Sequence, residues 1–469
     1  MKNIKYSIYV FSVLFLLSLM SCKKFLDEQS DKSRTIPTTI QDAQAILDGN
    51  SNMNIYPNID DGSLMSDEYF ILDTYFDRLK PNIMAEMTWD PNVLGDDNTW
   101  KSCYAAIVTA NVALETLNKI SPKANEIDAY NLAKGGAFFF RAYVHYQLAL
   151  VYSLPYQTST ANQELGIPYK ATSDINEPTI RPTLKDTYQK IIDDLKEAAS
   201  LLPISANFQT RPIKPAALGM LARVYLSMND YQNAYDFADS ALRMNNTLLD
   251  FNQISLPSPS STANPIPDFA ASITQYNPEV LFWAKCSSRA AYFSSTNGIC
   301  DTVLYASYAA NDLRKFLYFF KRNDGKPNTY GFRGGYLQSA AQPFAGVATD
   351  EIYLIRAECA ARLGHATDAM NDLNTLLRKR YNNTFTDLTA ADASTALSLI
   401  LHERRKELAQ RHNMRWYDLR RLNLDPNYAE TISRMQHGIL YTLPPNDLRY
   451  ALLIPVSVIQ YSGIEQNKR

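Results

Sequence analysis

Two segments of this chain, residues 214–244 and 350–378, share one pattern of helix, short break and second helix. The breaks fall at Asn229-Asp230 and at Gly364-His365. In both segments residues recur at offsets of 12 and 7: Ala222, Ala234 and Ala241 in the first, and Ala357, Ala369 and Leu376 in the second. Small residues at such offsets let two antiparallel helices cross closely, as in tetratricopeptide repeats. The plainer alternative is a helical hairpin with alanine at its crossing point. Because the two segments are not contiguous, they do not form a simple solenoid.

Further helices are expected from apolar residues that recur with a 3.6-residue period. The pattern predicts a short helix over 41–47 and long helices over 98–120, 128–152 and 183–202. Thr183 is the expected N-cap of the last of these, and Pro203 follows its end. The fold class is therefore mostly α, with tetratricopeptide-like helical hairpins.

A large irregular region interrupts this helical pattern over about 252–349. It is rich in Pro, Ser, Asn and Gly, and it carries many aromatic residues, including Trp283, Tyr292 and Phe293. An irregular stretch of this length is usually functional or disordered, and its aromatic content argues against disorder. We expect loops and short strands that pack on the helical body. Residues 49–97 are also predicted as loop, with one or two short helices.

The N-terminus has the features of an export signal that ends in a lipid attachment site. Lys2 and Lys5 precede an apolar run that reaches Met20, and Leu19-Met20-Ser21-Cys22 resembles the bacterial lipobox. This run is too short to span a bilayer and suits a secretory signal. We therefore predict a signal peptide over 1–21, an acylated Cys22, a tether over 22–40 and a single helical domain over 41–469. The alternative is an ordinary signal peptide in which Cys22 is incidental.

Composition excludes several other classes of protein. The net charge is −2 and the pI is about 6.3, so nothing favours nucleic-acid binding. After Met20, no apolar run approaches the roughly 18 residues of a membrane helix. The chain is rich in flat amphipathic rings, with 30 Tyr and 20 Phe, which suit core, interface or ligand contacts.

Motifs for metal binding and catalysis are missing from the sequence. The cysteines after Cys22 form no C-x-x-C pair, and the five histidines have no ligand spacing. Cys103 and Cys359 are expected to be buried, whereas the sequence leaves open whether Cys286 and Cys300 form a disulfide. No phosphate loop, dinucleotide fingerprint or nucleophile elbow is present. We therefore predict no cofactor, no metal and no enzymatic activity.

Charged residues concentrate in three acidic pairs and in one arginine-rich run. We interpret the pairs Asp67-Glu68 and Asp96-Asp97 as solvated loop acids, and Asp193-Asp194 is not a facing acid/base pair. The run over 403–421 alternates Glu and Asp with many Arg. We expect one helix crossed by ion pairs, including Glu407 with Arg411 at i+4, rather than a surface for nucleic acid.

Several of these stretches together resemble the RagB/SusD family of outer-membrane nutrient-uptake lipoproteins. The similarity is spread over nearly the whole length. It lies in Cys22 to Glu28, Trp100 to Asn111, Arg141-Ala142-Tyr143, Tyr188 to Pro203, Lys214 to Leu226, Asp350 to Glu358, the arginine-rich run and Leu452-Leu453-Ile454-Pro455.

The resemblance implies a SusD-like fold, an outer-membrane location and a partner. Such proteins sit as a lid on a TonB-dependent (SusC-like) barrel and capture glycan or peptide before import. The helical hairpins would face the barrel, and the irregular face would hold the ligand. The membrane would be reached only through the N-terminal lipid, with the body at the cell surface.

Candidate ligand contacts come from the segments that correspond to the groove of glycan-binding relatives. They are Asp67, Arg78, Trp89 and Asn92 before the first long helix, and Trp283, Tyr292 and Phe293 in the irregular region. Trp89 is the strongest of them, because sugars stack on flat rings. For each, the alternative is a role in core or loop packing. Two other functional classes stay open, an exported helical hydrolase and a structural repeat scaffold without a small ligand.

Overall fold

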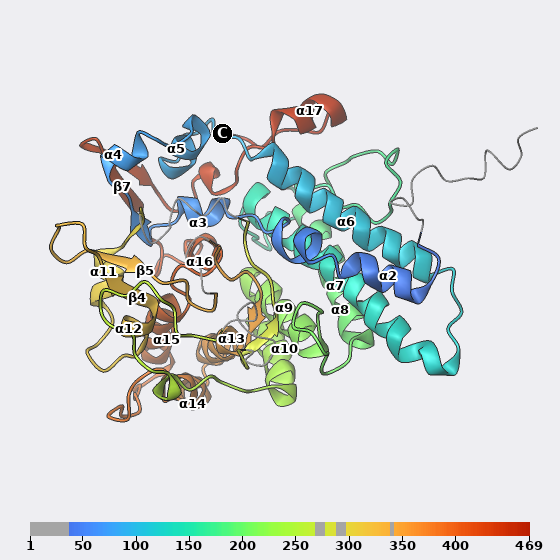
Figure 1. Cartoon of the computed structure of the whole chain (residues 1–469). Helices are drawn as coiled ribbons and strands as arrows, with labels where there is room; N and C mark the ends of the chain where they lie inside the picture. The colour runs from blue at the N-terminus through green and yellow to red at the C-terminus, as the bar shows by residue number, and fades with distance from the viewer. Residues whose placement is uncertain (1–36, 268–276, 288–296, 338–341) are drawn as a thin grey trace, which may run out of the picture. The chain divides into compact units, whose positions relative to one another are not determined.

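The computed structural model describes residues 37–267, 277–287, 297–337 and 342–469 (Figure 1). The chain divides into two units, Met1–Thr38 and Thr39–Arg469. The predicted signal peptide and Cys22 lie outside the described residues. All labelled elements of Figure 1 belong to the second unit.

Three long helices form the first half of the helical body: α6 (Asp97–Leu117), α7 (Ile127–Tyr152) and α8 (Leu184–Leu201). They confirm the helices predicted over 98–120, 128–152 and 183–202. Thr183 caps α8 as expected, because its hydroxyl accepts a hydrogen bond of 3.1 Å from the Asp186 amide. From Phe139 to Tyr152, α7 is buried on every side, as expected for a helix that packs against α6 and α8 at once.

Two helical hairpins form the second half: α9 (Lys214–Ser227) with α10 (Tyr231–Met244), and α13 (Thr349–Arg362) with α14 (Ala366–Leu377). Both were predicted, and the alanines at their crossings, Ala222, Ala234, Ala357 and Ala369, are fully buried. The turns use left-handed backbone at Asn229 (φ 58°) and Gly364 (φ 89°). Although about a hundred residues separate the hairpins in the sequence, α10 packs directly on α13 (Figure 1).

The region between these hairpins consists of short elements, as predicted. They are η4 (Phe251–Gln253), β2 (Val280–Phe282), β3 (Ile299–Cys300), α11 (Thr302–Ala306), α12 (Arg314–Tyr318), β4 (Phe319–Lys321), β5 (Tyr330–Phe332) and β6 (Val347–Ala348). Antiparallel pairs join β2 to β6 and β4 to β5. Much of the region packs around a second apolar core, which includes Phe319, Phe332 and Trp283.

The N-terminal part of the unit is made of short elements that tie distant segments together. They are α2 (Ile40–Leu47), η2 (Ser51–Ile55), α3 (Asp61–Met65), β1 (Tyr69–Phe70), α4 (Asp73–Phe76), α5 (Pro81–Met87) and, before α7, η3 (Ala124–Glu126). β1 pairs with β3 from the irregular region, with Tyr69 opposite Cys300. The first segment of the body is thereby joined to its middle.

The arginine-rich run forms two helices, α15 (Ala393–Glu407) and α16 (Met414–Leu422), so the prediction of a single helix was wrong. The break contains Gln410 and Asn413, both with left-handed backbone at φ 50° and 49°. Asn413 tolerates this conformation because its amide group hydrogen-bonds to Ser63 and to the Ile59 carbonyl. The break therefore depends on contacts with residues about 350 positions away.

The chain ends in a β-hairpin followed by η6 (Leu448–Tyr450) and α17 (Val456–Ser462). The hairpin consists of β7 (Ile432–Gln436) and β8 (Ile439–Leu443), joined by the two-residue turn His437-Gly438. Both turn residues have positive φ, at 51° and 73°, as a tight hairpin turn requires. In the described part of the chain, no helix combines the length and apolar character needed to cross a bilayer.

All four described cysteines are buried and free. Burial of Cys103 and Cys359 was predicted. Cys286 and Cys300 lie in different apolar cores and form no disulfide, which answers the question that the sequence left open.

Candidate functional site

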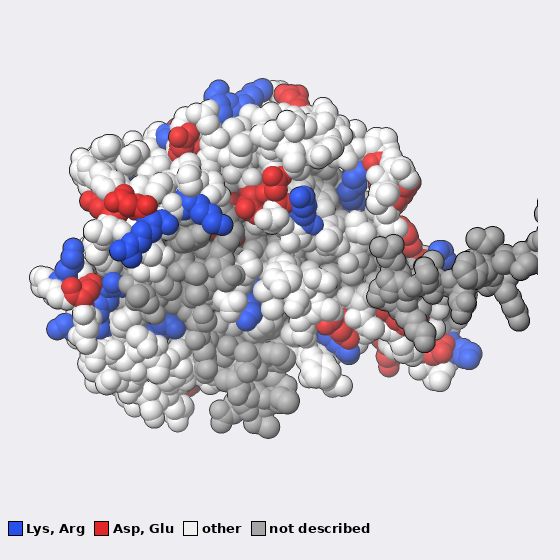
Figure 2. All heavy atoms as spheres, turned by 45° about the horizontal axis from the view of Figure 1, so that its top comes forward, with Lys and Arg blue, Asp and Glu red and all other residues white. Residues whose placement is uncertain are grey.

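A polar cleft of about 440 Å³ lies where the N-terminal segment, the irregular region, α15 and β7 meet. Its lining residues are Asp67, Asp301, Val303, Leu304, Ser307, His402, Arg405, Lys406, Glu430, Thr431, Ile432 and Ser433. We refer to this set as the polar cleft. A smaller cavity of about 170 Å³ adjoins it and shares Arg405 and Glu430. On the face of the molecule shown in Figure 2, acidic and basic side chains lie close to one another rather than in one large patch of a single sign.

Asp67 holds two arginines at one edge of the cleft. Its carboxylate accepts hydrogen bonds from Arg405 at 2.9 Å and from Arg415 at 2.7 and 2.9 Å. Arg415 also pairs with Glu430. Burial would raise the pKa of Asp67, but the two guanidinium groups outweigh it and hold this pKa well below its usual value. Asp67 therefore stays ionised and fixes Arg405 at the cleft wall.

Glu68 lies next to this ion pair but has a different environment. It is 4% exposed and accepts a hydrogen bond of 2.9 Å from the Gln410 amide. Burial raises its pKa to about 8. The interpretation of Asp67-Glu68 as solvated loop acids was therefore wrong, since both side chains are enclosed by residues from the arginine-rich run. Asp194 is likewise buried, with Arg141 bonded to both of its carboxylate oxygens.

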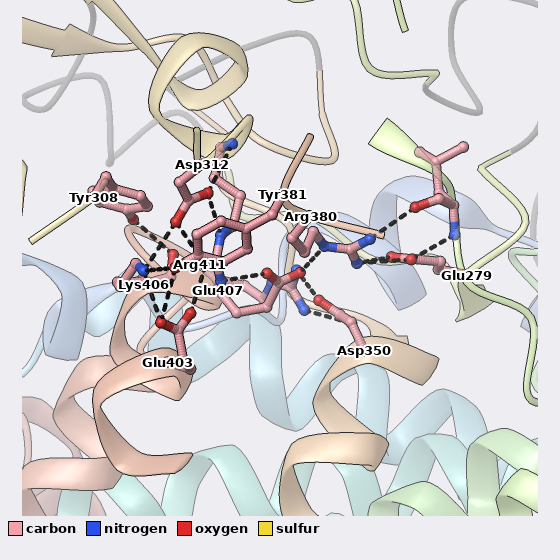
Figure 3. A network of polar contacts seen from close by, with 12 residues as sticks. Glu279, Tyr308, Asp312, Asp350, Arg380, Tyr381, Glu403, Lys406, Glu407 and Arg411 are labelled. Carbon is pink, nitrogen blue, oxygen red and sulfur yellow. Dashed lines mark hydrogen bonds and ion pairs between the residues drawn. The ribbon is translucent and has the colours of Figure 1, made fainter. Parts of the chain in front are cut away.

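A buried ionic network, shown in Figure 3, is connected to the cleft through Lys406. Lys406, which also lines the cleft, donates to Glu403 at 2.8 Å and to the Tyr381 hydroxyl at 2.7 Å, and it pairs with Asp312 at 2.9 Å. Arg314 is completely buried and bonds to Asp312 and Glu403. Because every charge has a partner of opposite sign, the cost of burying these groups is offset by their mutual attraction.

The other half of the network joins the irregular region to the second helical hairpin. Arg380 bonds to Glu407 at 2.7 Å and to Glu279 at 2.7 and 3.0 Å, and Arg411 bonds to Asp350 at 2.6 and 3.0 Å (Figure 3). The predicted pair between Glu407 and Arg411 is not formed. The break after α15 turns Arg411 toward α13, whereas Glu407 faces Arg380 and Arg314.

The two predicted tryptophans are core residues in this structure. Trp89 is 1% exposed, and its indole N–H donates to the Met65 carbonyl at 2.9 Å. The Arg434 guanidinium lies 5.3 Å from its ring centroid. Trp283 is 5% exposed, within the second apolar core. Neither ring offers a face to a ligand in this conformation. Both rings pack in the core, which is the alternative role that the sequence analysis left open for them.

The other predicted contacts are distributed over different places. Asp67 lines the polar cleft, whereas Arg78 and Asn92 are exposed and do not line it. Tyr292 and Phe293 lie outside the described residues. Of the described candidates, the structure therefore brings only Asp67 to the cleft, and the binding roles of all seven stay predictions.

Sequence reasoning missed most of the residues that line the cleft. Asp301 and Ser307 belong to the predicted irregular region, but nothing distinguished them from its other polar residues. His402 and Arg405 belong to the run that we interpreted as a structural helix. Thr431 and Ser433 alternate with buried Ile432 and Arg434 in the structure, but the apolar residues of this strand do not alternate in the sequence, so no period-of-two signal was available.

The cleft combines polar side chains with a small apolar surface. It offers hydroxyl groups, carboxylates, one partly exposed guanidinium and apolar walls from Val303, Leu304 and Ile432. Among the residues that the structure describes, no three His, Cys, Asp or Glu side chains come together in a way that would hold a metal ion. Polar groups around a small apolar surface can orient an oligomeric ligand by hydrogen bonds.

The fold and the cleft together define a helical protein with repeat-like hairpins on one part and a polar cleft on another. Two family models match the chain. One, described as starch-binding and associating with the outer membrane, matches residues 24–226. The other, the SusD family model, matches residues 349–450. The chain belongs to the SusD/RagB family.

A curated relative supports this assignment. SusD-like protein P2 of Formosa agariphila is 30% identical over 151 residues, which is 31% of this chain. The match covers 28% of the length of that relative.

Solved structures share the fold. A SusD superfamily protein from Bacteroides thetaiotaomicron aligns with a TM-score of 0.73 at 20% identity, covering 92% of this chain and all of that one. A SusD-like carbohydrate binding protein from Bacteroides vulgatus aligns with a TM-score of 0.66 at 18% identity, covering 91% and 97% of the two chains. At this level of identity the likeness establishes the SusD-like helical fold that the sequence predicted.

Proposed function

We propose that this protein is an outer-membrane lipoprotein that captures a nutrient oligomer at the polar cleft and delivers it to a TonB-dependent transporter. The observation that carries this proposal is the cleft itself. It combines Asp67 from the N-terminal segment with Asp301 and Ser307 from the irregular region, the two parts of the chain where the family resemblance implies ligand contacts. The family description, starch-binding and outer-membrane associated, supports carbohydrate as a ligand.

Ligand capture is tested by blocking the cleft without disturbing the fold. Val303 lines the cleft and is 76% exposed, so Val303→Arg adds bulk and charge at little structural cost. Val456→Arg is the matched control, because Val456 is 46% exposed on α17 and does not line the cleft. Calorimetric titration with panels of oligosaccharides and oligopeptides should show at least about tenfold weaker binding for the first variant only. Equal affinities for both variants would place the site elsewhere.

Delivery to a transporter is tested by purification from the outer membrane. The native protein, solubilised in mild detergent, should co-purify with a TonB-dependent barrel, and mass spectrometry of the complex should identify the bound ligand. Repeated purification without a barrel, from cells whose genome has no neighbouring transporter gene, would contradict the proposal.

Anchoring depends on Cys22 in this proposal, because one acylated end can hold a folded body at a bilayer. A Cys22→Ala variant should fold and bind ligand but leave the membrane fraction. If it stayed in that fraction at wild-type levels, the lipid anchor would be wrong.

A second ligand class is favoured by one feature of the cleft. None of its described lining residues is Phe, Tyr or Trp, the rings on which sugars commonly stack. Oligopeptides are therefore the second candidate, as the RagB branch of the resemblance also implies.

A further inference from the structure

One wall of the polar cleft is a stretch of four consecutive residues, Glu430 to Ser433, at the start of β7. Glu430 and Thr431 directly precede β7, and Ile432 and Ser433 are its first two residues, whose side chains point to opposite faces of the strand. Ile432 is buried whereas Thr431 and Ser433 are exposed, as this alternation requires. The strand therefore borders the cleft with its edge, where main-chain groups lie.

The register of the hairpin identifies which main-chain groups point outward from this edge. The two-residue turn makes Gln436 and Ile439 a hydrogen-bonded pair, and such pairs alternate along an antiparallel ladder. Arg434 and Ile432 therefore bond to β8, opposite Tyr441 and Leu443. The N–H and C=O groups of Ser433, and of Thr431 before it, point away from β8.

This edge has no strand beside it among the described residues, where β8 is the only strand that pairs with β7. The strand is also held firmly in place. Arg434 donates to the Met87 and Ser66 carbonyls, both at 2.6 Å, and to the Leu64 carbonyl at 3.3 Å. Strand addition requires a strand edge with unused main-chain groups. If that edge is already rigid, the protein loses little conformational entropy when the peptide binds.

Other residues that line the cleft suit the side chains and the terminus of an extended peptide. Arg405 is 28% exposed, and its guanidinium has five N–H donors, more than its contacts with Asp67 at 2.9 Å and with Glu430 at 3.9 Å use. A carboxylate can therefore pair with it. Val303 and Leu304 provide apolar contacts. Four residues of strand span roughly 13 Å, so a segment of about three to five residues fits along this edge.

We propose that the free edge of β7 binds an extended oligopeptide by strand addition, with Thr431 and Ser433 as pairing positions and Arg405 as the partner of a peptide carboxylate. This inference rests on the proposed function and names the ligand class of the same cleft. Main-chain pairing would accept many sequences, which suits a protein that gathers nutrients, whereas Arg405 would favour peptides with an acidic residue or a free C-terminus near it.

The first experiment uses the wild-type mature protein and changes only the ligand. A pool of random pentapeptides with free C-termini is incubated with the protein, bound members are identified by mass spectrometry after gel filtration, and one is resynthesised for titration. Methylating the backbone nitrogens of that peptide should weaken its binding at least about tenfold, because the main-chain hydrogen bonds are lost.

The second experiment changes the protein at two matched positions. Ser433 and Thr442 face each other in the ladder as a pair without hydrogen bonds, so proline at either position removes no bond within the hairpin. Ser433→Pro removes an outward N–H on the cleft side, whereas Thr442→Pro removes one on the far edge of β8. We expect about tenfold weaker peptide binding for the first and less than about twofold change for the second. Thermal unfolding of both variants checks that they are folded.

The outcomes separate this inference from the function on which it rests. If oligosaccharides such as maltohexaose bind while the peptide pool does not, strand addition is overturned and ligand capture stands. Strand addition is also overturned if the N-methylated peptide binds as well as its parent, or if both proline variants weaken binding equally. If neither ligand class binds and no barrel co-purifies, the proposed function fails as well.

Discussion

The helical hairpins and the region around α15 and α16 are stabilised in opposite ways. In the hairpins, small apolar residues such as Ala222 and Ala234 are fully buried where neighbouring helices cross. In α15 and α16, buried arginines pair with carboxylates that lie far away in the sequence, as Arg421 does with Glu358. The first kind of packing follows from spacing within one segment, whereas the second requires two segments to meet. Local apolar patterns therefore indicated the hairpins, and no local pattern could identify the ionic partners.

The largest loss in the free energy of unfolding is expected when a buried arginine of the ionic network is removed. Arg314 is fully buried and bonds to Asp312, Glu403 and Glu407 at 2.5 to 3.0 Å. Arg314→Met leaves these carboxylates without their common partner, so we expect the free energy of unfolding to fall by about 3–5 kcal/mol. Urea denaturation of the mature protein measures it. Arg243→Met, at a side chain that is 79% exposed, is the control. Similar values for both variants would show that the network adds little.

Acid should weaken the ionic contact between α16 and α13 before it weakens the packing of the alanines at the helix crossings. Burial raises the pKa of Glu358, but Arg421 and Arg362 outweigh it and lower this pKa to about 2, from an ordinary value of 4.5. The unfolded state therefore binds more protons between these values, so this stabilisation is present above pH 4.5 and is lost as the pH falls through 2. The loss is up to about 3 kcal/mol.

The test compares urea denaturation of wild type and Glu358→Gln at several pH values between 5 and 2. The variant should be less stable at pH 5, because Arg421 and Arg362 lose a charged partner, but its stability should fall less steeply with acid. If the stabilities of wild type and Glu358→Gln fell in parallel as the pH was lowered, Glu358 would not have the lowered pKa assigned to it.

Enlarging a crossing residue tests the apolar region. Ala234 is fully buried on α10, at the crossing with α9. Ala234→Leu should lower the free energy of unfolding by about 1–3 kcal/mol, because the helices must move apart. Gln232→Leu, at an exposed position of the same helix, should have a much smaller effect. If Ala234→Leu were neutral, close helix crossing would not be what holds the hairpin.

The smallest effect is expected for an ion pair at the surface. Arg378 bonds to Asp387, and the two side chains are 54% and 46% exposed. Water and salt screen this pair, so Arg378→Ala should change the free energy of unfolding by less than about 1 kcal/mol. Urea denaturation should show this small difference shrinking further from low to high salt. If Arg378→Ala lowered the free energy of unfolding more than Arg314→Met, exposed ion pairs would stabilise this protein more than buried ones.

Much of the fold was predictable because its signals are local. The 3.6-residue periods, the Thr183 cap and the alanine offsets each act within one helix or one hairpin, and the structure confirms them. The break between α15 and α16 was missed, since left-handed backbone at Asn413 is stabilised by Ser63 and Ile59. An N-terminal segment thus decides where a C-terminal helix begins.

The site was predictable only in part, for the same reason. The sequence indicated the segments that contribute to the cleft, and Asp67 was among the residues chosen. It could not show that the Arg434 guanidinium lies against the Trp89 ring, or that Arg405 and Ser433 line the same cleft as Asp67, because each of these arrangements joins residues that are far apart in the sequence.

By itself, the sequence determined the helical class, the two hairpins, the family and the expectation of a lipid anchor at Cys22. These depend on spacing, composition and short motifs, which are properties of neighbouring residues. Tertiary structure alone decided which charges are buried together, which aromatic rings are core and which strand edge is left open at the cleft. A long-range ion pair or a free strand edge exists only after distant segments have met. The physical reason is that the burial and the pairing of a residue depend on its surroundings rather than on its type.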